Sequence, residues 1–259
     1  MPRTQALQDW ITQLFPGQAP DLAPASADAS FRRYFRITLA DGSTRVIMDA
    51  PPEHEDCRPY LQVARLLDDA GVHVPRVFAE DLQQGFLLLS DLGNTTYLDA
   101  LKAHPDSAPA LYREASAALV TLQKASRPGV LPEYDRALLS RELQLFPDWY
   151  IARHLGITLS ETQQAALTGV FEKILANNLA QPKVFVHRDY HSRNLMISTP
   201  NPGVLDFQDA VYGPHTYDLV SLFRDAYISW EEEQELDWAI RYWEMARKAS
   251  LPVPADFYD

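Results

Sequence analysis

One stretch of this 259-residue chain decides its fold, and it reads VFVHRDYHSRNLMI from Val184 to Ile197. An apolar strand precedes the polar segment His187–Asn194 and another apolar strand follows it, so the polar side chains share one loop. A loop of this content between two core strands is more typical of a functional site than of a plain connection. A third apolar strand, Val204–Leu205, leads directly to Asp206 and places a second carboxylate at a strand end.

Asp189, Asn194 and Asp206 offer the groups that phosphoryl transfer requires. The reaction needs an oriented acceptor hydroxyl and cations that bridge the phosphates. Asp189 can accept the hydroxyl proton, while the Asn194 amide oxygen and the Asp206 carboxylate are the hard oxygen donors that Mg²⁺ prefers. The pattern predicts an ATP-dependent phosphotransferase with an alcohol acceptor, with ATP and Mg²⁺ as cofactors and Asp189 as the catalytic residue.

The polar residues around these three have more than one interpretation. His187 and His191 are expected to support the loop by hydrogen bonding, although His187, Asp189 and His191 could instead bind zinc. A zinc site would leave Asn194 and Asp206 without a role, and so would a plain polar turn. Asp218 opens a predicted helix and is expected to cap it or to support the catalytic loop. Asp209 is either a further metal or sugar ligand or a solvated turn residue.

The amino-terminal part of the chain has the pattern of a small sheet with a helix. The segments Phe31–Ile37 and Arg45–Met48 flank Asp41-Gly42, which predicts a β-hairpin. An amphipathic pattern over Arg58–Ala70 predicts a helix, and Gly85–Leu89 is apolar enough for a strand buried on both faces. Residues 1–92 are therefore expected to form the nucleotide-binding lobe.

Helical spacing dominates after Gly93, interrupted only by the three short strands described above. Ser160 and Gln163 have the spacing of a capping box ahead of one such helix, and another helix is expected from about Glu231. Residues 93–259 are therefore predicted to form a larger, helical catalytic lobe. Together the two parts predict an α+β protein of two lobes.

The composition narrows the class of partner. The net charge is −12, so no broad positive field attracts nucleic acid or anionic lipid. Cys57 is the only cysteine, which excludes an intramolecular disulfide, and no apolar run approaches the length of a membrane span. We expect a cytoplasmic protein, with a monomer favoured and with neither nucleic acid nor membrane as a partner.

The motif pattern also resembles a known family. The spacing H-x-D-x-H-x-x-N at residues 187–194, with Asp206-Phe207-Gln208 after the next hairpin, is similar to the catalytic and metal motifs of the aminoglycoside and choline phosphotransferases. Gly213–Leu219 resembles a further segment of that family, and the Ala-Pro-Glu motif of protein kinases is absent from the sequence. The resemblance implies a two-lobe protein-kinase-like fold, with a small antiparallel sheet lobe and a larger helical lobe.

A narrower resemblance concerns the acceptor. Residues 30–36, 47–52, 88–93 and 203–210 resemble the bacterial anomeric sugar kinases of cell-wall recycling. That family phosphorylates the C1 hydroxyl of N-acetylmuramate and N-acetylglucosamine, which implies a small-molecule amino sugar as the substrate. Another small alcohol, such as an aminoglycoside, choline or a homoserine-like compound, is the alternative. Ser90, Asp91 and Leu92 stand at the expected lobe junction and are candidates for nucleotide binding.

Two features depart from the kinase pattern. No glycine lies between Gly17 and Gly42, and Met48 stands where the third-strand lysine is expected. Arg32, Arg33 and Arg36 are the nearest cations that could replace that lysine as nucleotide-binding residues. The missing lysine also leaves open a nucleotide-binding pseudokinase that acts as an interaction module. Family members continue through further helices, so the chain is expected to be either short or truncated at its C-terminus.

Overall fold

The computed structural model describes residues 2–18, 20–27 and 31–258, apart from the side chains of residues 2, 26 and 27. Met1, Ser30 and Asp259, which bound the predicted lobes and the first resemblance segment, lie outside the described residues. The chain divides into two compact units. Unit 1 contains Met1–Ala115 and Ser192–Asp209, and unit 2 contains Ser116–His191 and Ala210–Asp259. The predicted lobe boundary between residues 92 and 93 remains a prediction.

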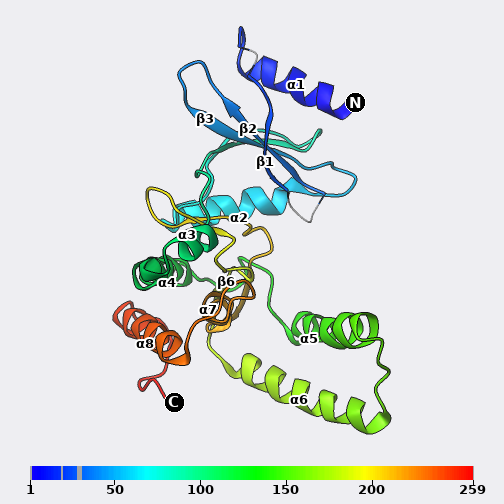
Figure 1. Ribbon diagram of the computed structural model, residues 1–259, viewed down its shortest axis with the longest axis vertical. Helices are drawn as coiled ribbons and strands as arrows, with labels where there is room; N and C mark the ends of the chain where they lie inside the picture. Colours follow the sequence, from blue (N-terminus) through cyan, green and yellow to red (C-terminus); the bar gives the residue numbers. More distant parts are fainter. Residues whose placement is uncertain (1, 19, 28–30, 259) are drawn as a thin grey trace. The chain divides into compact units, whose positions relative to one another are not determined.

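Unit 1 is built on a five-stranded antiparallel sheet whose strand order is β1-β2-β3-β5-β4 (Figure 1). The strands are β1 (Ala23–Ala27), β2 (Arg33–Thr38), β3 (Thr44–Asp49), β4 (Val77–Asp81) and β5 (Phe86–Ser90). The predicted hairpin is β2–β3, with Gly42 in the left-handed region at φ 81° and the Asp41 carboxylate accepting from the Ser43 N–H at 2.9 Å. Strand β5, which lies between β3 and β4, is buried from Phe86 to Leu89, as its apolar run predicts.

Two helices pack on this sheet. Helix α1 (Pro2–Leu14) contributes Leu7, Trp10 and Ile11 to a core cluster with sheet residues Ile37 and Phe86. Helix α2 (Cys57–Asp69) is capped at its N-terminus by Asp56, whose carboxylate accepts from the Arg58 N–H at 2.9 Å. Its apolar stripe is buried over Tyr60, Leu61, Val63, Ala64 and Leu67.

The remainder of unit 1 consists of short elements and a second hairpin. Helix α3 (Tyr97–Ala103) is followed by a 3₁₀ turn (Pro105–Ser107) and by α4 (Ala108–Lys124), within which the division between the units falls. Strands β7 (Leu195–Met196) and β8 (Gly203–Val204) form an antiparallel hairpin. Backbone hydrogen bonds from the Val204 N–H to the His73 carbonyl at 2.7 Å and from the Ile197 N–H to the Thr95 carbonyl at 2.9 Å fix this hairpin within unit 1.

Unit 2 places helices around one strand pair. Strands β6 (Lys183–Val186) and β9 (Val211–Pro214) are antiparallel, and the helices are α5 (Arg136–Leu145), a π-helical segment (Phe146–His154), α6 (Glu161–Ala180), α7 (Tyr217–Phe223) and α8 (Glu232–Lys248). Tyr134, Leu139, Leu175, Val184 and Val186 belong to one core cluster, which fixes α5 and α6 against the strands. The predicted capping box of Ser160 and Gln163 is present at the start of α6.

Several elements differ from the sequence prediction. Strand β1 lies in a proline-containing segment for which the sequence analysis predicts no strand, and it pairs along the edge of the sheet beside β2. The three short strands predicted around residues 187–194 are present, but β8 begins one residue earlier than predicted, at Gly203, and β6 pairs with β9, a strand that the sequence analysis did not predict. Helix α7 begins with Thr216 at its N-cap position, so Asp218 lies in the first turn and is not the cap.

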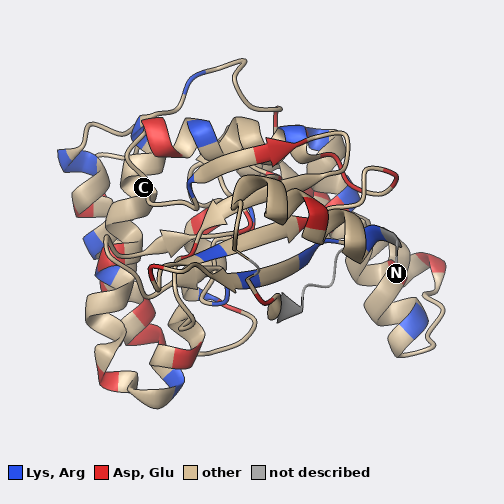
Figure 2. Ribbon diagram, turned by 90° about the horizontal axis from the view of Figure 1, so that it is seen from above, with Lys and Arg blue, Asp and Glu red and all other residues tan. Residues whose placement is uncertain are grey.

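Charge and hydropathy along the elements agree with the composition. Basic and acidic segments are interspersed along the ribbon, without a continuous basic stripe on the described helices and strands (Figure 2). Among the described residues, none of the helices combines the length and the apolar character that crossing a bilayer requires.

Candidate active site

Asp218 fixes the backbone immediately before Asp189. This carboxylate on α7 accepts hydrogen bonds from the His187 N–H at 2.7 Å and from the Arg188 N–H at 3.0 Å. The two donors follow β6, at the point where the strand ends and its ladder no longer satisfies the backbone. Arg188 is left-handed, with φ 80°, a conformation that costs an L-residue about 1–2 kcal/mol. Two backbone hydrogen bonds to one buried carboxylate offset this cost and set the direction in which the chain enters Asp189.

His187 has a structural contact that defines its tautomer. Its Nδ1 accepts a hydrogen bond from the Asp189 N–H at 3.2 Å, and its ring is buried. Because a backbone N–H can only donate, Nδ1 must be the acceptor, and a neutral ring then carries its proton on Nε2. His191 belongs to the same turn, since its N–H donates to the Asp189 carbonyl at 3.0 Å and its ring meets that of Tyr227 edge-on at 5.4 Å.

Asp218 itself is fully buried, and burial raises the pKa of its carboxyl to about 7. The two backbone N–H donors oppose this rise in the pKa, whereas the negative charge of Asp189 adds to it. Asp218 therefore titrates close to neutral pH while it holds the backbone of His187 and Arg188.

Asn194 and Asp206 come together within unit 1. The β7–β8 hairpin pairs the residues that follow Asn194 with those that precede Asp206, and the Leu205 N–H donates to the Asn194 carbonyl at 2.9 Å. The Asn194 amide nitrogen then lies 3.4 Å from Asp206 Oδ2. Gln208 donates to Asp206 Oδ1 at 2.8 Å, so both carboxylate oxygens are oriented by side-chain amides.

Arg32 lies beside this pair. Its guanidinium contacts Glu55 with Nε 3.3 Å from Oε2, and its Nη1 lies 3.9 Å from Asp206 Oδ1. The Arg32 side chain is only 12% exposed. Burial lowers its pKa, but contacts with Tyr34 and Glu55 outweigh burial and raise it. The arginine is therefore held charged beside the carboxylate that sequence analysis assigns to the metal.

The other two candidate arginines have different partners. Arg33 pairs with Asp49, its cross-strand neighbour, whose fully buried carboxylate also binds Arg3. Arg36 makes a two-pronged contact with Asp91, at 2.5 and 2.9 Å, and donates to the Gly93 carbonyl at 2.9 Å. The structure therefore distinguishes three residues that the sequence could only group.

The remaining predicted residues lie in unit 1 as well. The Ser90 hydroxyl accepts from the Arg76 N–H at 2.9 Å, and Asp91 is the partner of Arg36. Leu92 is buried against Gly203, where an added Cβ would lie 2.8 Å from Leu92 Cδ1. Asp209 is exposed, and the Gln208 amide lies 3.4 Å from its Oδ2.

The donor set suits magnesium better than zinc. Among the residues that the structure describes, three or more His, Cys, Asp or Glu side chains do not gather in a group that could hold a metal ion. Mg²⁺ is commonly bound through one or two protein oxygens together with substrate phosphates. One amide and one carboxylate, Asn194 and Asp206, match that requirement, because the nucleotide would supply the other ligands.

The sequence analysis gave no role to three residues that contact the predicted site residues or Arg188. Glu55 and Gln208 hold Arg32 and Asp206, and Glu142 pairs with Arg188 at 2.5 Å. Gln208 directly follows the Asp206-Phe207 motif and could have been found by its position. Glu55 and Glu142 belong to no motif, and only the tertiary structure brings them to their arginines.

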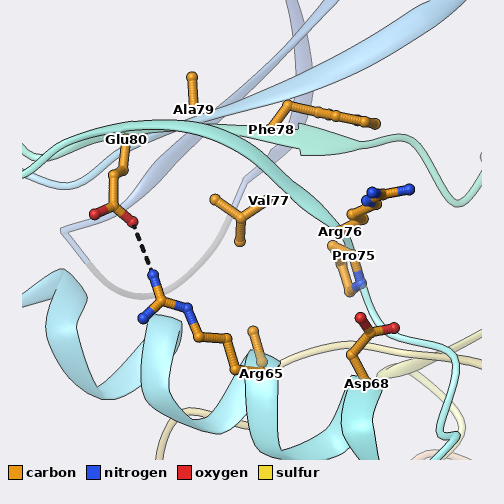
Figure 3. A pocket seen from close by; sticks show the side chains of 9 residues that line it. Arg65, Asp68, Pro75, Arg76, Val77, Phe78, Ala79 and Glu80 are labelled. Atoms are coloured by element: carbon orange, nitrogen blue, oxygen red, sulfur yellow. Dashed lines mark hydrogen bonds and ion pairs between the residues drawn. The ribbon is translucent and has the colours of Figure 1, made fainter.

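The structure also contains a cavity of about 330 Å³ between α2 and strand β4. Arg65 and Asp68 on the helix, Arg76 just before the strand and Val77–Glu80 on the strand line it, and Arg65 and Glu80 form an ion pair across it (Figure 3). None of the predicted site residues borders this cavity, so it is separate from the candidate active site.

Solved structures share the fold of this chain. An ADP-bound aminoglycoside phosphotransferase matches over 94% of this chain and 85% of that chain, with a TM-score of 0.67 and 15% sequence identity. A choline/ethanolamine kinase family protein from Mesorhizobium loti matches over 93% and 76%, with a TM-score of 0.64. The α+β, protein-kinase-like fold expected from the sequence is thus confirmed.

The chain belongs to the phosphotransferase enzyme family, whose model matches residues 21–254. An N-acetylmuramate/N-acetylglucosamine kinase from Pseudomonas aeruginosa is 53% identical over 99% of this chain and 78% of that protein. A kinase of the same name from Neisseria meningitidis is also 53% identical, over 99% of this chain and 77% of its own length. The family predicted from the motifs is confirmed.

Proposed function

We propose that this phosphotransferase transfers the γ-phosphate of ATP to the anomeric C1 hydroxyl of N-acetylmuramate and N-acetylglucosamine, as a step of peptidoglycan recycling. The observation that carries the proposal is the 53% identity, across 99% of the chain, to proteins named as kinases of these two sugars. The solved structures of the aminoglycoside phosphotransferase and the choline/ethanolamine kinase family protein are each only 15% identical to this chain. They therefore support the fold and not the acceptor.

Asp189 is the catalytic residue in this proposal. Its carboxylate would accept a hydrogen bond from the sugar hydroxyl and orient the oxygen toward the γ-phosphorus. It would take up the hydroxyl proton as the new P–O bond forms and the bond from the γ-phosphorus to the bridging oxygen of ATP breaks, which releases ADP. Asp218 and His187 support this role by fixing the backbone on both sides of Arg188. His191 closes the turn after Asp189.

Asn194 and Asp206 would hold Mg²⁺. The ion, when bound, neutralises charge on the phosphates during transfer. Gln208 keeps Asp206 oriented, and the β7–β8 hairpin keeps Asn194 and Asp206 together. Asp209 follows in the same turn and remains a candidate sugar ligand.

Arg32 is the candidate that the contacts favour for the phosphates, because it is charged, largely buried and next to Asp206. Arg33 and Arg36 have carboxylate partners within unit 1 and are weaker candidates. Ser90, Asp91 and Leu92 remain candidates for adenine, with residues 1–92 as the nucleotide-binding lobe and residues 93–259 as the catalytic lobe. Use of ATP and a single cysteine favour action in the cytoplasm, and we propose that the chain is a monomer.

The decisive experiment is a transfer assay with ATP and Mg²⁺ on N-acetylmuramate, N-acetylglucosamine, choline, homoserine and an aminoglycoside. Phosphorus NMR of the product identifies the oxygen that carries the phosphate. We expect a sugar 1-phosphate from both amino sugars, and a loss of at least ~100-fold in kcat for Asp189→Asn with nucleotide binding retained. Transfer to a different alcohol would assign another acceptor, and nucleotide binding without any transfer would identify a pseudokinase.

A further inference from the structure

Arg188 is held at its side chain as well as at its backbone. Its guanidinium binds the Glu142 carboxylate with Nη2 2.5 Å from Oε1. The guanidinium carbon, Cζ, lies 5.8 Å from the centre of the Tyr134 ring. Glu142 lies on α5, 46 residues earlier in the chain. All of these groups belong to unit 2, so one compact body contains the whole arrangement.

Glu142 is in turn held by two tyrosines. The Tyr134 hydroxyl donates to its Oε2, and the Tyr217 hydroxyl lies 3.3 Å from the same oxygen. Burial raises the pKa of both phenols, in the case of Tyr217 to about 12, so both remain protonated donors at neutral pH. One carboxylate oxygen therefore receives the hydroxyls while the other receives the arginine.

The fold explains why Glu142 reaches this position. Leu139 is buried in the core cluster with Val184 and Val186 of β6. Residues three apart share a helix face, so the packing of Leu139 turns Glu142 toward the end of that strand. Tyr134 is fixed by its N–H, which donates to the Tyr212 carbonyl at 2.8 Å, and by contact with Gly213, where an added Cβ would lie 2.6 Å from Tyr134 Cβ. The anchor is thus built into the core.

We propose that Glu142 is a positioning residue: with Tyr134 and Tyr217 it binds the Arg188 side chain, keeps that residue left-handed and so sets where Asp189 stands. The inference rests on the proposed function. Glu142 and Arg188 are each more than a fifth exposed, so their ion pair contributes little to global stability. A shift of the loop by even about 1 Å, however, can lower the rate of transfer by about 100-fold. Loss of the anchor should therefore reduce turnover far more than stability.

The test is a double-mutant cycle on the full chain with Glu142→Gln, Arg188→Gln and the double variant. We measure kcat, the KM for ATP and for N-acetylglucosamine, and the thermal midpoint. Each single variant is expected to lower kcat by at least ~10-fold with both KM values within about twofold of the wild type. Because the two residues act as one unit, the kcat of the double variant should be no lower than that of the more impaired single variant. Glu172→Gln is the matched control, since Glu172 forms an exposed ion pair with Arg136 in the same unit and should leave kcat unchanged.

Each result has a definite meaning. A Glu142→Gln variant with a kcat close to that of the wild type, or losses that multiply in the double variant, would overturn the inference. A loss that appears in the thermal midpoint while kcat per folded molecule stays normal would also overturn it. Tyr217→Phe removes one of the two hydroxyls that contact Glu142, and it should lower kcat in the same way. This variant keeps the test decisive if Glu142→Gln fails to fold. A wild-type chain that phosphorylates neither sugar would overturn the proposed function and the inference together, whereas an active wild type matched by Glu142→Gln would overturn the inference alone.

Discussion

At the scale of single residues, the different partners of Arg32 and Arg33 predict different roles, Arg32 in nucleotide binding and Arg33 in stability. Arg32 lies 3.9 Å from Asp206, whereas Arg33 neutralises the buried Asp49. Arg32→Gln should raise the KM for ATP by about 10-fold or more, because a charged contact with phosphate is lost. Steady-state kinetics with ATP varied against a saturating amino sugar measures this change.

Arg33→Gln provides the comparison at the neighbouring position, where β2 begins. Removing this arginine leaves the buried Asp49 carboxylate with Arg3 as its remaining described partner, so the free energy of unfolding should fall by about 1–2 kcal/mol. The KM for ATP should change little. Urea unfolding and the same kinetics test both statements, and a larger rise in KM for Arg33→Gln than for Arg32→Gln would assign the phosphates to Arg33.

The raised pKa of Asp218 predicts a pH dependence of stability. The carboxyl titrates near 7 in the folded protein and near 3.8 as its ordinary value, so between these values the folded state binds more protons than the unfolded state. Its contribution to stability is complete below the lower value and is lost as the pH rises through about 7, by at most about 1.4 kcal/mol per pH unit. Urea unfolding of wild type and Asp218→Asn from pH 5 to 8 should show the wild type losing its relative stability as the pH rises. A constant difference between the two proteins would refute the shifted pKa.

The sequence singles out the residues that we propose as reacting, but not the side chains that contact and support them. Asp189, Asn194 and Asp206 stand in a fixed spacing at strand ends, which a pattern can reveal. The choice among Arg32, Arg33 and Arg36 depends on whether Glu55, Asp49 or Asp91 meets each one, and these contacts span 16 to 55 residues of chain. Glu142 lies further outside any pattern, because only the packing of Leu139 directs it toward Arg188.

At the scale of secondary structure, α1 is a structural part of the sheet unit. Trp10 is 6% exposed, lies 5.6 Å from the Phe86 ring and belongs to the core cluster of the sheet. Trp10→Ala should lower the free energy of unfolding by about 3–5 kcal/mol, because it opens a cavity in that core. Trp149→Ala is the control, since Trp149 is 56% exposed and its main contact is an arginine stacked at 4.0 Å, worth about 1 kcal/mol or less. Similar losses in the two variants would show that α1 does not contribute to the core.

Local sequence signals explain which elements were found and which were missed. Helix α2, strand β5 and the capping box of α6 have complete local signals, and the structure confirms each of them. Strand β1 has the sequence Ala-Pro-Ala-Ser-Ala, which lacks the β-branched and aromatic residues of a strand, and it exists only because β2 offers an edge. The pairing of β6 with β9 joins segments about 30 residues apart, which no local pattern could indicate.

At the scale of the whole molecule, the net charge of −12 predicts a difference between the two proposed sugars. N-acetylmuramate carries a carboxylate and is repelled at long range, whereas N-acetylglucosamine is neutral. Raising the ionic strength from about 0.01 to 0.15 M shortens the screening length from about 30 to 8 Å. With ATP saturating, kcat/KM for N-acetylmuramate should therefore rise by about twofold, while the value for N-acetylglucosamine stays constant. A fall for N-acetylmuramate would instead indicate a local basic group that attracts its carboxylate.

The order in which the chain visits its two units has a consequence for protein engineering. Unit 1 is completed by Ser192–Asp209, a segment that returns after the chain has already entered unit 2. Backbone contacts such as Leu98 N–H to Ser192 carbonyl at 3.0 Å tie that segment to the first 115 residues. A hybrid gene that joins this protein to a relative at one crossover near residue 115 would give a first unit with a foreign β7–β8 hairpin. Coherent hybrids need three junctions, near residues 115, 191 and 209, so recombination at random points would seldom exchange one unit intact.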